Sequence, residues 1–254
     1  MSIVQKSIPF PPIKLEKIIK YLSYINERPV NITELKNNKI DFGRGRGDIT
    51  RFLVQIELVD VENSKVKLTD RGRTLLKFVR DDRPTFLFKI LFNNYMIDKV
   101  LTYRVLIDTI RELQSSNINE LYSIANSRLR ELSPSLWINK VAYRSLISLA
   151  TDLEVIERRG ESLTYVGQVT KIRELVTKCV FSRGRVRYLD IDKLCNILEL
   201  DDRELLCNIL NNCIVPVKSP SAVKIYRVRD IEAVVEKVSK LSVDLVMKFS
   251  SPER

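Results

Sequence analysis

The spacing of apolar residues in the first third of the chain predicts two helices. The first starts in the Pro-Phe-Pro-Pro segment at 9–12 and ends before Pro29. Its apolar residues recur mostly at steps of three and four, which places them on one helix face: Ile13, Ile18, Ile19, Leu22 and Ile25. A short second helix follows, with Asn31 or Thr33 as its N-terminal cap.

A glycine-rich turn leads into a third helix. The segment 42–48, Phe-Gly-Arg-Gly-Arg-Gly-Asp, contains three of the seven glycines of the chain. It predicts a turn, because glycine adopts backbone conformations that other residues avoid. Asp48 is a candidate cap for a helix over 48–59, whose apolar residues fall on one side: Ile49, Phe52, Leu53 and Ile56.

A hairpin and a further helix complete this unit. Polar residues separate two β-prone runs at 58–61 and 65–69, which predicts a hairpin, and an amphipathic helix follows over 70–79. The order helix, short helix, turn, helix, hairpin, helix is that of a helix-turn-helix with a β-hairpin behind it.

The string Leu-Thr-Asp-Arg-Gly-Arg-Thr-Leu-Leu at 68–76 resembles the wing-to-last-helix signature of winged-helix transcription regulators of the MarR and PadR type. In this resemblance Leu68 and Thr69 end the wing and Asp70 begins the helix. The resemblance covers residues 13–80. It implies a recognition helix in the DNA major groove, basic wings on the backbone or minor groove, and a two-fold dimer.

The middle third repeats this order more loosely. Three helices are predicted, over 84–94, 98–114 and 117–132. A further helix after Trp137 runs into a hairpin over 154–167, with Gly160 at its tip. Short internal matches support a degenerate repeat: 117–121 with 31–35, 144–149 with 51–56, and Leu163-Thr164 with Leu68-Thr69.

The last third has a similar order of elements. A helix over 168–180 leads to a basic turn or strand at 182–190. Two helices with Asp190 and Asp201 as candidate caps come next. Two β-prone runs and one long amphipathic helix then follow, within 214–228 and 229–249.

These patterns predict a mainly α protein with small β-hairpins, arranged as tandem winged-helix domains. Two domains are expected, and the third rests on the element order alone. The expected boundaries are 1–82, 83–167 and 168–254, the last domain with a long C-terminal helix.

The charge of the chain favours polyanionic partners. In 254 residues, 43 Lys and Arg against 32 Asp and Glu give a net charge of +11. Nucleic acid is the first partner that this balance suggests, and an anionic membrane surface the second. The three predicted domains have net charges of +5, +2 and +4, so the middle one is expected to be a spacer or a protein-contact module.

The candidate DNA-binding residues are cations and one amide. Arg51 and Gln55 would share an exposed face of the recognition helix, where Arg reaches guanine and Gln reaches adenine. The others suit phosphate contacts, because they precede a helix, open one or lie in a basic cluster or wing: Arg44, Arg46, Lys65, Lys67, Arg71, Arg73, Arg158, Arg159, Arg183, Arg185 and Arg187. Lys218 and Lys224 would extend the third wing.

Structural alternatives remain open for these residues. The glycine turn could hold solvated arginines only, and charged hairpins are ordinary surface structure. A phosphate loop is excluded, because the spacing does not match Gly-x-x-x-x-Gly-Lys-Ser/Thr. The apolar stripe of the C-terminal helix either packs on its own domain or forms a homodimer.

The composition argues against catalysis and metal binding. The chain has no histidine, which removes Ser-His-Asp triads, Cys-His dyads and His-ligated metals. None of the four cysteines stands in a Cys-x-x-Cys pair, so buried reduced thiols are expected: Cys179, Cys195, Cys207 and Cys213. We therefore expect no catalytic residue, no metal, no cofactor and no enzyme activity.

The sequence therefore predicts a non-enzymatic protein that binds double-stranded DNA, as a transcription regulator or a replication or plasmid-maintenance factor. The alternative is a winged-helix scaffold or adaptor that contacts a protein partner through domain 2 or the C-terminal helix. The first residues contain no apolar run long enough for a signal peptide, and no stretch is long enough to span a membrane. A cytoplasmic, nucleoid-associated location is expected.

Overall fold

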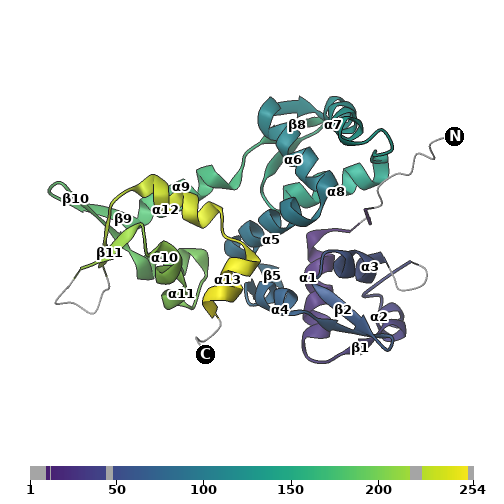
Figure 1. Ribbon diagram of the computed structural model, residues 1–254, viewed down its shortest axis with the longest axis horizontal. Helices are drawn as coiled ribbons and strands as arrows, with labels where there is room; N and C mark the ends of the chain where they lie inside the picture. The colour runs from purple at the N-terminus through teal and green to yellow at the C-terminus, as the bar shows by residue number, and fades with distance from the viewer. Residues whose placement is uncertain (1–9, 12, 44–47, 218–224, 251–254) are drawn as a thin grey trace.

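The computed structural model describes residues 10–11, 13–43, 48–217 and 225–250. As predicted, the protein is mainly helical with small antiparallel sheets. The order helix, strand, helix, helix, strand, strand occurs twice along the chain, and a third unit has the same order with one additional strand after its first helix. Figure 1 shows these three units as separate lobes around a central helix, α5.

The first unit builds a three-stranded sheet in the order β1-β3-β2. Val30 pairs with Val66, and Val59 pairs with Leu68. The elements are α1 (Leu15–Asn26), β1 (Val30–Asn31), α2 (Ile32–Asn37), α3 (Asp48–Gln55), β2 (Val59–Glu62) and β3 (Lys65–Leu68). Helix α3 is shorter than the predicted 48–59, because Glu57 turns the chain with a left-handed φ of 60° before β2.

The second unit has the same topology, with the sheet order β6-β8-β7. Gly160 lies in the turn between β7 and β8, as predicted, with a φ of 63°. The elements are α6 (Leu101–Leu113), β6 (Ser115–Asn117), α7 (Ile118–Leu132), α8 (Lys140–Asp152), β7 (Ile156–Arg159) and β8 (Ser162–Tyr165).

The residue-to-residue correspondence between these two units in the structure differs from two of the three internal sequence matches. Leu58 N donates to Leu53 O and Val155 N donates to Ala150 O, each at 2.9 Å, which pairs Leu53 with Ala150 at an offset of 97 residues. Strand pairing gives the same offset of 97 between Val66 and Leu163. The helix match read from the sequence, 144–149 with 51–56, had an offset of 93, which is about one helical turn too short. The hairpin match, 163–164 with 68–69, had an offset of 95, which is one two-residue strand repeat too short.

The third unit adds an edge strand to the same arrangement, and its sheet order is β11-β12-β10-β9. The elements are α9 (Gln168–Cys179), β9 (Val180–Arg183), β10 (Val186–Asp190), α10 (Ile191–Leu198), α11 (Arg203–Leu210), β11 (Ile214–Pro216) and β12 (Ile225–Val228). Asp190 caps α10 as predicted. The cap of α11 is Asp202 and not Asp201, which instead pairs with Arg80.

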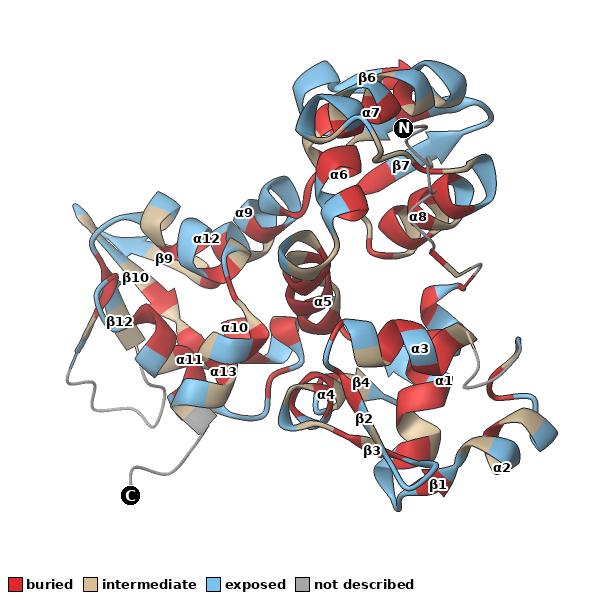
Figure 2. Ribbon diagram, turned by 45° about the vertical axis from the view of Figure 1, so that its right-hand side comes forward, coloured by how far each residue is buried: buried red, intermediate tan, exposed pale blue. Residues whose placement is uncertain are grey.

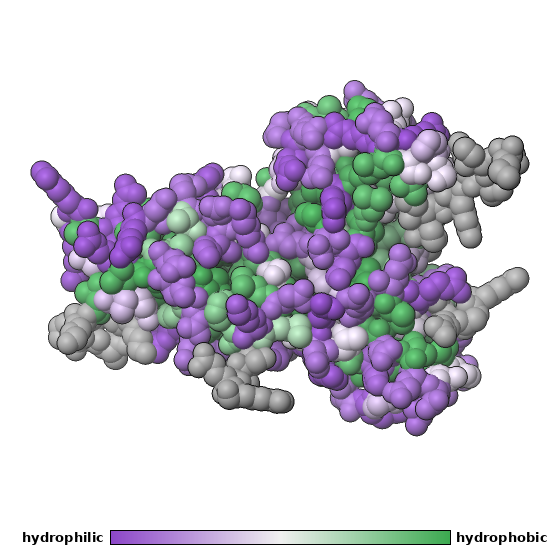
Figure 3. All heavy atoms as spheres, in the orientation of Figure 1, coloured by the Kyte–Doolittle hydropathy of each residue, from purple (hydrophilic) through white to green (hydrophobic). Residues whose placement is uncertain are grey.

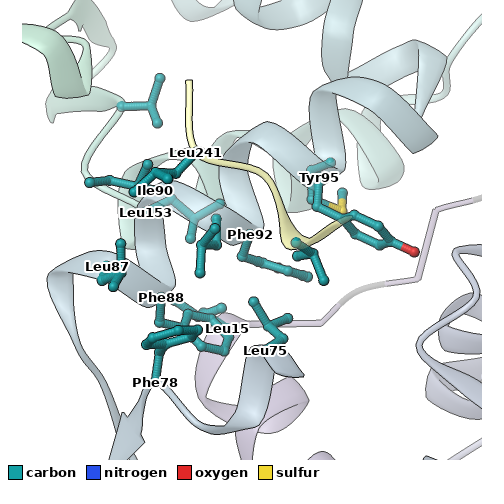
Figure 4. Packing of buried hydrophobic residues seen from close by; sticks show 14 of the residues in the cluster. Leu15, Leu75, Phe78, Leu87, Phe88, Ile90, Phe92, Tyr95, Leu153 and Leu241 are labelled. Carbon is teal, nitrogen blue, oxygen red and sulfur yellow. The ribbon is translucent and has the colours of Figure 1, made fainter. Parts of the chain in front are cut away.

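Helix α5 (Phe86–Lys99) forms the common core of the molecule. It is apolar around most of its circumference, which is typical of a helix with neighbours on every side. Figure 4 shows its residues Phe88 and Phe92 packed with Leu15 of the first unit and with Leu75, which lies between that unit and α5. Figure 2 shows the same helix as a buried red column. It is linked to the first unit by α4 (Asp70–Leu76), β4 (Val79–Arg80) and β5 (Arg83–Pro84).

The predicted long C-terminal helix over 229–249 is wrong: two helices form instead, α12 (Ile231–Ser239) and α13 (Val243–Ser250). The break is stabilised by α5, because Asn94 Nδ2 donates to the carbonyl oxygens of Ser239 and Leu241 at 2.8 Å each. Leu241 and the valines of α12 are buried inside the chain, so this apolar stripe packs on its own molecule.

Candidate nucleic-acid interface

The N-terminus of α3 is held by a buried carboxylate that the sequence analysis missed. Asp41 is 4% exposed and accepts hydrogen bonds from the backbone N–H groups of Ile49 and Thr50, both at 2.9 Å. It also accepts from Thr50 Oγ1 at 2.6 Å, and Tyr21 OH lies 2.5 Å from that hydroxyl. Asp41 therefore does the capping that was predicted for Asp48, which lies inside the helix.

The exposed face of α3 is arranged as predicted. Phe52 and Leu53 are buried, whereas Arg51 and Gln55 point to solvent. Within the described part of the chain, Arg51 has neither an ion pair nor a side-chain hydrogen bond, so its guanidinium is available to a partner. The predicted phosphate contacts Arg44 and Arg46 lie outside the described residues.

The first hairpin has less free positive charge than the sequence suggested. Lys65 is exposed and, among the described residues, unpaired. Lys67 Nζ lies 2.6 Å from Glu62 Oε2 and 3.8 Å from Asp60 Oδ2. The hydrogen bond to Glu62 raises the pKa of Lys67 above its ordinary value. The positive charge of Lys67 is thus offset by two carboxylates of its own hairpin.

The two arginines at the start of α4 are engaged within the protein. Arg71 Nε lies 2.8 Å from Asp244 in α13, and Arg71 Nη1 lies 2.6 Å from Glu57. The hydrogen bond to Asp244 raises the pKa of Arg71 further. Arg73 pairs with Asp70 at 2.9 Å. Arg71 therefore links the first unit to the C-terminal helix and is poorly placed for a phosphate contact.

A cationic cavity of about 210 Å³ lies in the second unit, at the N-terminal ends of α7 and α8. Three cations line it: Lys140 and Arg144 from α8, and Arg158 from β7. All three are exposed, and none forms an ion pair with a residue that the structure describes. The rest of its wall is formed by Ile118, Asn119, Tyr122, Tyr143 and Glu161.

The two tyrosines of this cavity are held in place by a contact between their rings and by hydrogen bonds from their hydroxyl groups. Tyr122 and Tyr143 meet edge to face with ring centroids 5.0 Å apart. Tyr122 OH donates to Ile138 O at 3.0 Å, and Tyr143 OH donates to Ile118 O at 2.8 Å. These bonds tie the start of α8 to the start of α7, where backbone amides and the helix dipoles add to the attraction for an anion.

Sequence reasoning named Arg158 for DNA binding but missed Lys140 and Arg144. A signal was present: from Lys140 to Thr151 the helix sequence contains no acidic residue. The low net charge of the middle third concealed it, because the acidic residues of that segment lie on other elements, except for Asp152 at the C-terminal end of α8. Arg159 does not line the cavity; its side chain is 82% exposed in the hairpin and pairs with Glu157 at 2.9 Å.

The predicted cluster in the third unit forms a β-hairpin. Arg183, Arg185 and Arg187 are exposed on β9, the turn and β10. They lie far along the chain from the cavity of the second unit, in the lobe at the left of Figure 1. Helix α11 is the third helix of this unit and contains one arginine, Arg203. Arg203 forms an ion pair with Asp192 at 2.7 Å. Lys218 and Lys224 are outside the described residues.

Three of the four cysteines are buried: Cys179, Cys195 and Cys213. Burial raises the pKa of the Cys179 thiol to about 11 and that of Cys195 to about 12. All four thiols are free, and Cys207 is the more exposed one. In the described ranges, no group of three or more His, Cys, Asp or Glu side chains is placed to hold a metal ion. No helix there is both long and apolar enough to cross a bilayer.

Comparison of the chain with protein-family models, with curated proteins and with solved structures finds no match.

Proposed function

We propose that the protein binds double-stranded DNA through tandem winged-helix units, with α3 and α8 as the recognition helices. The observation that supports this most strongly is the cationic cavity of the second unit. Lys140 and Arg144 stand on the third helix of the unit, opposite Arg158 on its hairpin. In a helix-turn-helix this helix enters the major groove, and cations at its N-terminal end contact phosphates or guanines.

The first unit supplies the second recognition surface. Arg51 and Gln55 project from α3, and the buried Asp41 network fixes the start of that helix. In Figures 1 and 2, α3 and α8 lie on the same side of α5. One duplex that contacts both helices is therefore compatible with this arrangement, and a role in transcription regulation follows from the winged-helix resemblance.

The test is a titration of duplex DNA at several salt concentrations with the variant Arg144→Ala/Arg158→Ala. Each phosphate contact that is lost should reduce the slope of log K against log salt by about 0.9. We expect weaker binding and a slope smaller by up to about two. The matched control is Lys178→Ala/Lys237→Ala, which removes the same charge from exposed sites on α9 and α12.

Equal losses in both variants would reduce the effect to net charge and contradict a specific interface. Unchanged binding in the cavity variant, or no duplex binding by the parent protein, would favour the scaffold or adaptor alternative. Thermal melting of each variant separates a binding defect from unfolding.

A further inference from the structure

The outer face of the four-stranded sheet in the third unit has a row of side chains in direct cross-strand register. Phe181 of β9 is paired with Tyr188 of β10. Tyr188 is paired with Arg227 of β12, and Arg227 with Val215 of β11. Since paired residues in an antiparallel sheet project to the same side, these four side chains form one continuous row.

The opposite face of this sheet is the one that packs on the helices. Leu189, Ile214 and Val228 alternate with the row along their strands and are buried in the core. Phe181, Tyr188 and Val215 are half-buried and belong neither to that core nor to the apolar side chains packed against it. Two aromatic rings are thus left on a face that the described part of the protein does not use for its own core.

The two rings lie nearly parallel. The centroids of Phe181 and Tyr188 are 5.5 Å apart and their planes meet at 21°. The guanidinium carbon of Arg183 lies 5.8 Å from the centroid of Phe181. Flat rings of this kind, together with an arginine, are a surface on which nucleobases stack.

The charge on this face is positive. Arg183 and Arg227 are on the outer side, and Arg185 is in the adjoining turn; all three are exposed. The one carboxylate on this side of β10 is Asp190, and its Oδ1 is occupied as the cap of α10, 2.9 Å from Lys193 N. Figure 3 shows hydrophobic and hydrophilic residues interleaved at this end of the molecule.

We propose that this sheet face binds single-stranded DNA, with bases stacked on Phe181 and Tyr188 and phosphates held by Arg183 and Arg227. A duplex cannot use such rings, because its bases are already stacked inside the helix, whereas an unpaired strand presents them. Apart from the Tyr188 hydroxyl, the row offers no uncharged polar side chain to recognise a 2′-hydroxyl, which favours DNA over RNA. The site is separate from α3 and α8 and does not depend on the duplex proposal.

The test is fluorescence anisotropy with a labelled oligothymidine of about 12 nucleotides, a length within the usual site size. Stacking on one aromatic side chain usually contributes roughly 5- to 150-fold in affinity. We therefore expect Phe181→Leu/Tyr188→Leu to weaken binding at least about tenfold, because leucine keeps apolar area but not a flat ring. An abasic strand of the same length should bind the parent protein as weakly as the oligothymidine binds this variant.

The matched control is Arg144→Ala/Arg158→Ala, which should bind the oligothymidine as the parent protein does while losing duplex affinity. If it lost both affinities together, the two sites would not be separate and the proposal would fail. Unchanged oligothymidine binding by the leucine variant, or equal binding of the abasic strand, would also overturn it. Tighter binding of oligouridine than of oligothymidine would replace DNA with RNA as the ligand. Arg183→Ala/Arg227→Ala gives a second variant that leaves both rings in place, and it should also weaken binding.

Discussion

At the scale of single residues, a buried carboxylate, Asp41, organises the N-terminus of α3. Asp41 is buried beside Thr50 and accepts hydrogen bonds from two backbone amides of α3 and one hydroxyl. Amides at a helix N-terminus have no intrahelical acceptors, so this carboxylate satisfies donors that would otherwise be buried without partners. It orients the helix that presents Arg51.

We expect Asp41→Ala to reduce the free energy of unfolding by about 2–3 kcal/mol, the combined cost of a lost cap and unpaired buried donors. Asp41→Asn should cost less, because one acceptor oxygen remains. Chemical denaturation of both variants measures this difference. An alanine variant as stable as the parent protein would show that solvent or another acceptor replaces the carboxylate.

At the scale of elements, ion pairs decide which cations of a hairpin are available. Lys65 and Lys67 are both on β3, and the sequence treats them alike. Register places Lys67 opposite Asp60 and Lys65 opposite Glu62, and the Lys67 ammonium reaches both carboxylates. A phosphate would have to compete with these carboxylates for Lys67 but not for Lys65.

The duplex titration should therefore distinguish the two lysines. We expect Lys65→Ala to reduce the salt slope by about one, whereas Lys67→Ala should change it by much less. Binding of one duplex by each single variant, measured at three or more salt concentrations, gives the slopes. Equal effects of both substitutions would mean that the Lys67 pairs open when DNA binds.

At the scale of the whole molecule, two glutamates at equivalent positions connect the first two units to α5. Glu57 follows α3 and Glu154 follows α8, and both have a left-handed φ of 60°. Glu57 lies 3.0 Å from Lys99, and Glu154 lies 2.5 Å from Lys89, both lysines being on α5. Glu154 also pairs with Lys171 of α9. The turns that follow α3 and α8 are thus each fixed to the shared core.

This arrangement predicts a stability that falls in acid. Burial raises the pKa of Glu154, but its bonds to Lys171 and Lys89 outweigh this and hold the pKa below its ordinary value. A carboxyl with a lowered pKa in the folded state stabilises it above the unfolded-state pKa, and that contribution is lost as pH falls through the folded-state pKa. Because Glu154 is 38% exposed, solvent screening limits the contribution to about 0.5–1 kcal/mol.

We expect Glu154→Gln to melt at a lower temperature than the parent protein at neutral pH, with the two melting temperatures converging as the pH falls below about 4. Thermal melting of both proteins across this range makes the comparison. A difference that stays constant with pH would show that shape or packing, and not charge, is what the substitution removes.

The sequence by itself determined most of the helices and the hairpins of the first two units, but not the short strands β1, β4, β5 and β6 or the division of the C-terminal helix. Asn31 and Asp190 cap the predicted helices, and the residues on the two sides of α3 are buried and exposed as expected. Caps, turns and hydrophobic periodicity act over a few residues, so they can be recognised without knowing the fold. The two hairpins of the first and second units were found for the same reason.

Only the tertiary structure decided features that depend on distant partners. A periodic pattern looks the same after a shift of one turn, so pairing across the chain was needed to set the offset of 97 between the units. Ser242 caps α13 locally by accepting from Leu245 N at 3.2 Å, but the carbonyl oxygens at the break between α12 and α13 are bonded by Asn94, which lies in another helix. The ion pair of Arg71 with Asp244 and the common cavity of Arg144 and Arg158 also depend on the tertiary structure. No local sequence pattern specifies which side chains from separate elements will face each other.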